Sequence, residues 1–282
     1  MARAVTVDDI RAAVRDVGLA DRAVCVHASL KSFGMVDGGA ETVVQGMLDV
    51  GTTVVVPTST FRFCMAPKPA GIPALPFNSE DDGSIPPAGT PPVASYDRAA
   101  SFVDPAMGAI PAAVLRNPRR IRGIHPLSSF TALGPDAGDV IAAQTPTHVY
   151  APLQEIVARQ GAVVCMGVGL DALTLIHLAE LQGGLRLLHR WAWDRDATVV
   201  EAVHGGCSRG FERLADAVQP AETRITVGGS VWRIFDAAAL LSLATERFAD
   251  DPAAGLCATP GCARCRDQEA YGSRRESRTQ RV

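Results

Sequence analysis

Short apolar runs that alternate with segments of helical spacing constrain the fold of this chain most strongly. Such runs occupy residues 23–27, 52–56 and 162–168, and the first two end at a polar loop and at Pro57. Continuous apolar runs of this length are typical of strands buried on both faces of a sheet. Segments with helical spacing follow at about 40–50 and 172–181. This β-α-β order predicts an α/β fold.

The rest of the chain predicts one domain over residues 1–265. Further helices are expected at 7–18, 107–118, 138–143, 152–160 and 236–248, and strands near 198 and at 224–235. The segment at about 66–100 contains 8 of the 19 prolines, so we expect an irregular loop that acts as a lid or as a wall of a binding site. The polar residues 266–282 are expected to form a disordered tail.

Charge and hydropathy exclude several classes of partner. The chain has 27 Lys and Arg against 30 Asp and Glu, a net charge of −3, which gives no basic excess for a nucleic acid. No apolar run reaches the length of a membrane span, and the first residues do not resemble a signal peptide. We therefore expect a cytoplasmic protein with no membrane or nucleic-acid partner. An odd number of cysteines, seven, argues against a disulfide framework.

His177 is the strongest single candidate for a catalytic residue. It lies in the helical pattern ALTLIHLAEL, and Glu180 follows three positions later on the same helix face. A carboxylate beside an imidazole fixes its tautomer and raises its basicity, as a general base near neutral pH requires. A core histidine with a satisfied partner is an equal alternative.

Four cysteines and one glycine-rich turn leave other interpretations open. Cys207 could be a nucleophile activated by His204 or His177, in an amide-cleaving or ligating enzyme. Cys262 and Cys265 could bind zinc with Cys257 or Cys207, but a second paired motif is missing, so we assign no metal ligand. The turn GVGLDA fits a dinucleotide motif weakly and is more simply a tight strand-to-helix turn.

Several blocks in one order resemble the aminoglycoside 3-N-acetyltransferase family. They are VHASLKSFG (26–34), GGAETVVQGML (38–48), GTTVVVPT (51–58), HPLSSFTALGPDA (125–137), APLQEIVARQGAVVCMGVGLDALTLIHLAE (151–180) and GCARC (261–265). The resemblance implies a mixed β-sheet flanked by helices, distinct from the GNAT fold. It also implies direct transfer of an acetyl group from acetyl-coenzyme A to an amine.

The resemblance also implies roles for individual residues. His177 corresponds to the family's general base, with Glu180 as its partner. The coenzyme-A region corresponds to the loop after the first strand and to the HP-x-x-S block, which here are Ser29, Lys31, Ser32, Phe33, Gly34, His125, Ser128 and Ser129. Hydroxyl groups, backbone N–H groups and a lysine at such positions suit pyrophosphate oxygens.

The chain departs from the family where the acceptor is expected to bind. Relatives carry acidic residues just before the cysteine of a C-x-x-x-F block, whereas here that stretch reads EAVHGGCSRGF. Asp97, Asp171 and Glu201 are the candidates for contacting the acceptor, and their small number favours a small-molecule amine less cationic than an aminoglycoside. A non-catalytic coenzyme-A-binding relative and a homodimer both stay open.

Overall fold

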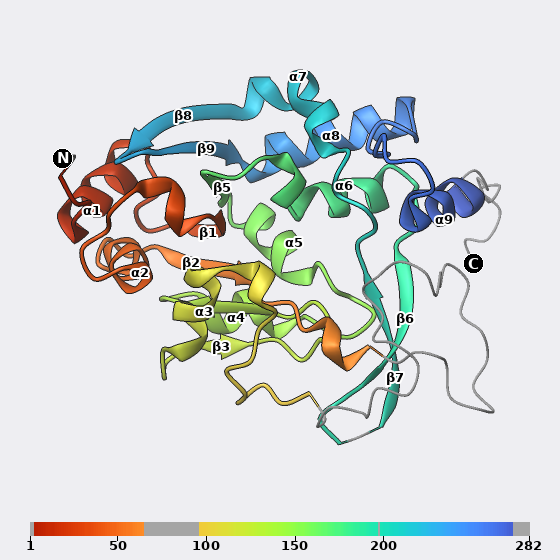
Figure 1. Ribbon diagram of the computed structural model, residues 1–282, viewed down its shortest axis with the longest axis horizontal. Helices are drawn as coiled ribbons and strands as arrows, with labels where there is room; N and C mark the ends of the chain where they lie inside the picture. The colour runs from red at the N-terminus through yellow and green to blue at the C-terminus, as the bar shows by residue number, and fades with distance from the viewer. Residues whose placement is uncertain (1–2, 65–95, 197, 273–282) are drawn as a thin grey trace.

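A seven-stranded mixed sheet forms the centre of the computed structural model, which describes residues 3–64, 96–196 and 198–272 (Figure 1). The strand order is β3-β4-β2-β1-β5-β9-β8. This confirms the predicted mixed sheet flanked by helices. The strands are β1 (Ala23–Ala28), β2 (Thr53–Pro57), β3 (Ile121–Arg122), β4 (Phe130–Leu133), β5 (Ala162–Met166), β8 (Glu222–Val227) and β9 (Ser230–Asp236).

Three parallel strands in the middle of the sheet create a switch point. β1 pairs in parallel with β2 on one side and with β5 on the other, while β3, β4, β8 and β9 add antiparallel pairs toward the two edges. The chain leaves β1 toward β2 and returns later to the opposite side as β5. In open α/β sheets the carboxyl ends of strands at such a point leave a crevice where ligands bind.

Helices cover both faces of the sheet because successive strand residues point to opposite sides. Val163 and Cys165 of β5 belong to one hydrophobic cluster, and Val164 and Met166 to the other. The first cluster packs against α4 (Ala137–Ala142), α5 (Ala151–Ala158), α6 (Leu175–Gln182), α7 (Ala215–Val218) and α8 (Ala237–Asp250). The second packs against α1 (Val7–Asp16), α2 (Ala40–Leu48) and α3 (Ala109–Arg116).

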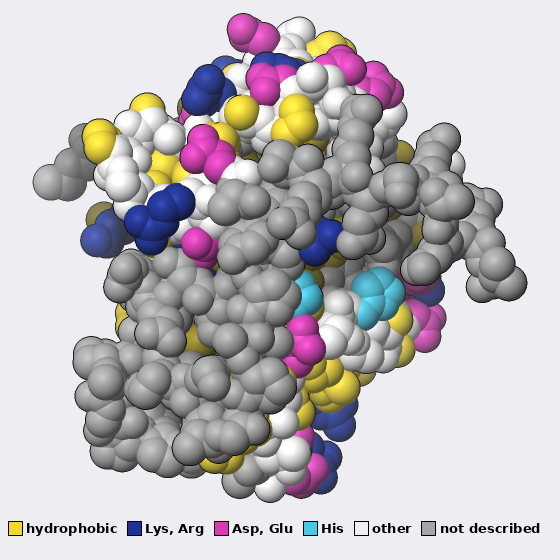
Figure 2. Space-filling view, turned by 90° about the vertical axis from the view of Figure 1, so that its right-hand side faces the viewer, with side chains coloured by type: hydrophobic (Ala, Val, Ile, Leu, Met, Phe, Trp, Pro, Cys, Tyr) yellow, Lys and Arg dark blue, Asp and Glu magenta, His cyan; other side chains and the backbone are white. Residues whose placement is uncertain are grey.

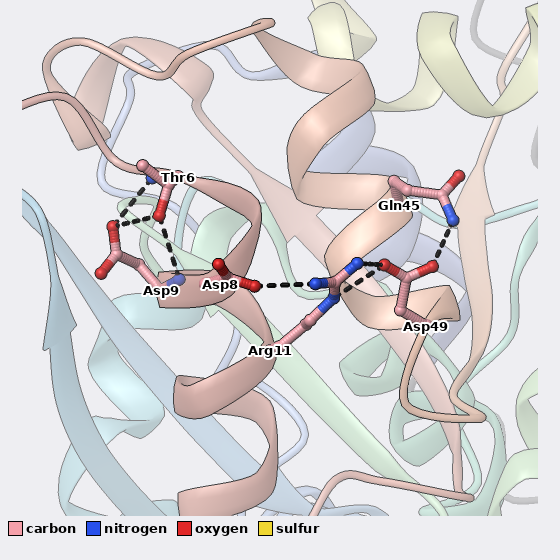
Figure 3. Close-up of polar contacts among 6 residues, drawn as sticks. All are labelled: Thr6, Asp8, Asp9, Arg11, Gln45 and Asp49. Carbon is pink, nitrogen blue, oxygen red and sulfur yellow. Dashed lines mark hydrogen bonds and ion pairs between the residues drawn. The ribbon is translucent and has the colours of Figure 1, made fainter.

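Local sequence fixes where α1 begins and how it meets α2. Thr6 caps the helix in a capping box with Asp9, each side chain accepting a hydrogen bond from the other's backbone N–H (Figure 3). Arg11 donates to Asp8, one turn away at 2.7 Å, and to Asp49 at the end of α2. The guanidinium therefore connects the two helices.

A separate two-stranded hairpin stands at one end of the molecule. β6 (Leu188–Trp193) and β7 (Val199–His204) pair in antiparallel fashion outside the main sheet (Figure 1). A bridge between Cys64 and Ala192 joins the hairpin to the segment after β2. Tyr96, Phe63 and Leu127 share a small apolar cluster with Ala192 and so anchor this end.

The structure corrects two expectations about the C-terminal third. The strand predicted at 224–235 is a hairpin of β8 and β9, turning at Gly228, which has φ +60°. Residues 266–272 of the predicted disordered tail belong to helix α9 (Ala263–Gly272), in which Gln268 packs into the interior and is 7% exposed. Most of the proline-rich loop (65–95) and residues 273–282 lie outside the described residues. None of the helices in the described ranges has the length and apolar character of a membrane-spanning segment.

Candidate functional site

A cavity of about 360 Å³ lies at the carboxyl ends of the central parallel strands. This is the edge at which the switch point between β1 and β5 predicts a ligand site, and the volume is within the range of about 300–1,000 Å³ typical of small-molecule sites. The wall comes from the ends of β1 and β2, the loop after β5, the start of α6 and the loop after β7. Its members include Val26, His27, Ala28, Pro57, Ser59, Met107, Ser128, Phe130, Tyr150, Val168, Asp171, Thr174, His177, His204, Gly205, Gly206, Ser208 and Arg264.

His177 and Glu180 form a hydrogen-bonded pair at this wall. Nδ1 of His177 lies 2.6 Å from Oε2 of Glu180, and the side chains are 11% and 1% exposed. Since a carboxylate oxygen accepts, the ring proton lies on Nδ1, which leaves Nε2 to interact with a ligand. The other carboxylate oxygen, Oε1, accepts a hydrogen bond of 2.8 Å from Nε2 of Gln268 in α9. Both oxygens of the buried carboxylate are therefore engaged.

Aromatic rings and a glycine hold the imidazole in place. The ring of Tyr150 stacks on His177 at 6.2 Å with an interplanar angle of 9°, and Phe211 meets it edge-on at 4.8 Å. A Cβ at Gly205 would lie 2.4 Å from Cδ2 of His177 and 2.5 Å from the Tyr150 hydroxyl oxygen. Burial and the nearby Glu180 raise the pKa of Tyr150 well above its usual value, so its hydroxyl stays protonated.

Two other histidines near the cavity are buried and uncharged. Burial lowers the pKa of His27 to about 4, and its Nε2 accepts a hydrogen bond of 3.4 Å from the backbone N–H of Thr174. Burial also lowers the pKa of His125 to about 4. Neither imidazole is protonated at neutral pH. Between His27 and His177, which both line the cavity, His177 is the one whose ring is bonded to a carboxylate.

The residues predicted to bind coenzyme A separate into two groups in space. Ser29, Lys31, Ser32, Phe33 and Gly34 lie in and around the 3₁₀ turn η1 (Leu30–Phe33), directly after the lining residue Ala28. Ser32 donates to the Ser29 carbonyl at 2.7 Å and bonds the Ser230 hydroxyl, while Phe33 packs edge-on against Trp232 in the core. Lys31 is exposed, and none of these five residues is among those that line the cavity.

In the HP-x-x-S block, Ser128 alone reaches the cavity wall. His125 is fully buried: Nδ1 accepts hydrogen bonds from the N–H groups of Leu127 and Ser128, and Nε2 donates to the Val203 carbonyl at 2.7 Å. Ser129 is also buried and bonds Thr58. The geometry gives His125 and Ser129 the role of shaping the turn that presents Ser128.

Of the acidic residues predicted to contact the acceptor, Asp171 lines the cavity. Asp97 is exposed and accepts a hydrogen bond from the backbone N–H of Ala99. Glu201 lies on β7, outside the cavity wall, and bonds His189 of the neighbouring strand. Within the described wall, Asp171 is the carboxylate and Arg264 the cation.

Cys207 does not line the cavity that contains His177. The residue is 3% exposed, and its sulfur lies among those of Cys257, Cys262 and Cys265. The arrangement does not support the alternative of a Cys207 nucleophile. Sequence reasoning missed Tyr150, Gly205 and Gln268 as contributors to the site, and the carboxylate pairing of Gln268 has no local signal because 88 positions separate it from Glu180.

Comparison of the sequence with known proteins identifies similar proteins of one family. A family model described as aminoglycoside 3-N-acetyltransferase matches residues 25–249. Aminoglycoside N(3)-acetyltransferase IX of Micromonospora chalcea is 33% identical over 189 residues, which are 64% of this chain and 64% of that protein. Aminoglycoside N(3)-acetyltransferase VII of Streptomyces paromomycinus is 34% identical over 172 residues, 58% of this chain and 56% of that protein. The matches thus span less than two thirds of these relatives.

Solved structures share the fold over more of the chain. The apoenzyme of aminoglycoside acetyltransferase AAC(3)-IVa has a TM-score of 0.74 and 23% identity, covering 96% of this chain and 99% of its own. Aminoglycoside acetyltransferase AAC(3)-Xa has a TM-score of 0.70 and 26% identity, covering 87% of this chain and 93% of its own.

The face of the molecule that carries the hairpin β6–β7 and α9 has mixed charge. Acidic and basic side chains of the described residues are interspersed on it, and histidines reach the surface (Figure 2).

Proposed function

Because the chain belongs to the aminoglycoside 3-N-acetyltransferase family, we propose that it transfers the acetyl group of acetyl-coenzyme A to an amino group of a small molecule. The observation that carries the proposal is the His177–Glu180 pair at the wall of the cavity, with Nδ1 bonded to the carboxylate and Nε2 left for a ligand. This is the arrangement that a general base requires.

The described wall fits the acyl donor. Val26, Ala28, Pro57 and Val168 offer apolar surface to a pantetheine arm, and the exposed Lys31, three residues after Ala28 in the chain, is a cation of the kind that binds diphosphate oxygens. Serine hydroxyls at the wall, including Ser128, can bind amide groups of the arm. Acetyl-coenzyme A supplies the acetyl group as a thioester whose carbonyl carbon an amine attacks.

His177 handles the proton of the attacking nitrogen. An ammonium ion has no lone pair, so the acceptor attacks as the neutral amine. Nε2 takes the proton that the nitrogen loses as the C–N bond forms and the C–S bond of the thioester breaks, and Glu180 stabilises the resulting imidazolium, which can return the proton to the leaving thiolate of coenzyme A. Gln268 holds the second oxygen of Glu180, and Tyr150 and Phe211 fix the plane of the ring. The protein thereby supplies orientation and a base, and no covalent enzyme intermediate is needed.

The acceptor is expected to carry few positive charges. The described wall contains one carboxylate, that of Asp171, and also one guanidinium, that of Arg264. A polycationic ligand gains affinity and orientation from a surplus of carboxylates. We therefore propose that Asp171 binds a single ammonium group of the acceptor, and that monoamines are used at least as well as aminoglycosides.

The test is a panel of monoamines and aminoglycosides incubated with acetyl-coenzyme A, with thiol release followed over time and products identified by mass spectrometry. We expect a mass gain of one acetyl group. In the variant His177→Ala the turnover should fall by about 10²–10⁴-fold, the range for loss of a general base. His148→Ala, at an exposed histidine outside the cavity wall, is the control. Full turnover in His177→Ala contradicts the proposal.

A further inference from the structure

Four cysteines from two distant parts of the chain meet beside the proposed active site. Cys207 follows β7, while Cys257, Cys262 and Cys265 lie just before and within the first turn of α9. Their four Sγ atoms all lie within 4.8 Å of one another, and Cys207, Cys262 and Cys265 are buried. The catalytic proposal makes no use of these thiols.

We propose that the four sulfurs bind one Zn²⁺ ion. Tetrahedral coordination at the usual Zn–S distance of about 2.3 Å places the sulfurs about 3.8 Å apart, so the cluster needs only small adjustments to receive the ion. Four thiolates close the coordination shell and leave no position for water or substrate. Such a site is structural, and a set of sulfur ligands alone favours zinc over harder divalent ions.

Groups around the cluster suit the negative charge of thiolates. A zinc ion with four thiolates carries a net charge of −2. Nη2 of Arg209 donates to Sγ of Cys262 at 3.1 Å, and the backbone N–H of Cys257 donates to Sγ of Cys265 at 3.3 Å. A positive guanidinium and a backbone donor aimed at sulfur stabilise the thiolate form over the neutral thiol.

The position of the ion explains why two remote segments meet. Gly205, Gly206 and Ser208, which line the cavity, come just before or after Cys207, and Gln268, which holds Glu180, follows Cys265 by three residues. Coordination would join these two segments. The ion would thus fix the start of α9, a helix with little apolar surface of its own, against the cavity wall.

Metal content of the full-length, tag-free protein tests the proposal independently of any activity. After expression with zinc and gel filtration, elemental analysis should find one zinc per chain. Cys262→Ala should lose the metal and unfold at a lower temperature. Cys165→Ala, which removes a buried sulfur of β5 outside the cluster, should keep it.

Thiol counting and cobalt substitution keep the test decisive if Cys262→Ala fails to fold. With zinc removed under denaturing conditions, all seven cysteines should react as free thiols. Co²⁺ in place of zinc should give the intense visible bands of tetrahedral thiolate coordination. Two disulfides within the cluster, bound iron in place of zinc, or metal-free protein of unchanged stability would each overturn the assignment.

Discussion

At the scale of single residues, the absence of a side chain at position 205 leaves room for the imidazole. Gly205→Ala should displace His177 or Tyr150, since its Cβ would lie 2.4–2.5 Å from their atoms. We expect a loss of about 1–3 kcal/mol in the free energy of unfolding. A base moved by about 1 Å should reduce kcat by about 100-fold.

The neighbouring glycine provides a matched control for that substitution. A Cβ at Gly206 would meet its nearest neighbour, Oε1 of Gln268, at 3.5 Å, which is ordinary contact. Gly206→Ala should therefore keep the melting temperature of the wild type. If the two substitutions lower the melting temperature equally, the close contact between position 205 and His177 does not contribute to stability.

The role of the Glu180 carboxylate beside the His177 imidazole can be tested with a substitution of nearly the same shape. Glu180→Gln keeps a hydrogen-bonding group near Nδ1 of His177 and removes the charge that stabilises an imidazolium. We expect kcat to fall between about 10- and 1,000-fold with KM nearly unchanged, because binding of the ground state does not depend on that charge. Glu246→Gln, an exposed carboxylate on α8 that bonds Ser242, is the control. A change in KM alone would argue against a role in proton transfer.

At the scale of elements, α9 supports the His177–Glu180 pair through a hydrogen bond from Gln268 to Glu180. Gln268→Leu removes the amide that donates to Oε1 of Glu180 and leaves this buried oxygen unpaired. We expect kcat to fall by about 10-fold, as is typical when a group that orients another is lost. Gln268→Glu, which sets a second carboxylate beside Glu180, should reduce kcat further. Gln154→Leu, on the exposed side of α5, should leave kcat unchanged.

The elements that sequence predicts well are those with a strong periodic pattern. β1, β2 and β5 are continuous apolar runs because helices cover both faces of these strands. The capping residues Thr6 and Asp9 indicate where α1 begins. The sequence predicts only the second strand of the hairpin β6–β7, since the first strand mixes bulky and charged residues and alternates in burial. Helix α9 has no apolar stripe, so its polar sequence predicts a disordered tail rather than a helix.

The same reasoning separates the predictable parts of the site from the rest. The pairing of His177 with Glu180 could be predicted because both lie on one helix face, three residues apart. The contacts of Tyr150 and Gln268 depend on the tertiary fold, which brings together residues far apart in the chain. For His125, the sequence does not reveal that the side chain is buried. Because it is buried, it stabilises the local fold and does not reach a ligand.

At the scale of the whole molecule, two buried imidazoles should make stability depend on pH. The pKa of His27 and that of His125 are each lowered by burial from 6.5 to about 4. The unfolded chain therefore binds protons at a pH where the folded protein does not. The stability that each neutral imidazole contributes is fully present above pH 6.5 and is lost as the pH falls from there to about 4.

His125 shows why protonation is incompatible with the fold. Its Nδ1 accepts two backbone N–H groups, so a proton on that nitrogen would face two donors. A pKa lowered from 6.5 to about 4 corresponds to about 3 kcal/mol for each imidazole. Urea denaturation at pH 7, 6, 5 and 4.5 should therefore show a steep fall in the free energy of unfolding below about pH 6.5.

A substitution that cannot be protonated isolates this contribution. His125→Gln keeps an oxygen that can accept from the backbone and should be less stable than the wild type at pH 7, but it should lose about half of the acid dependence because His27 remains. His148→Gln, at an exposed histidine that bonds Gln154, should follow the wild-type curve. If His125→Gln and the wild type lose stability in parallel as the pH falls, the acid sensitivity comes from groups other than the buried imidazole.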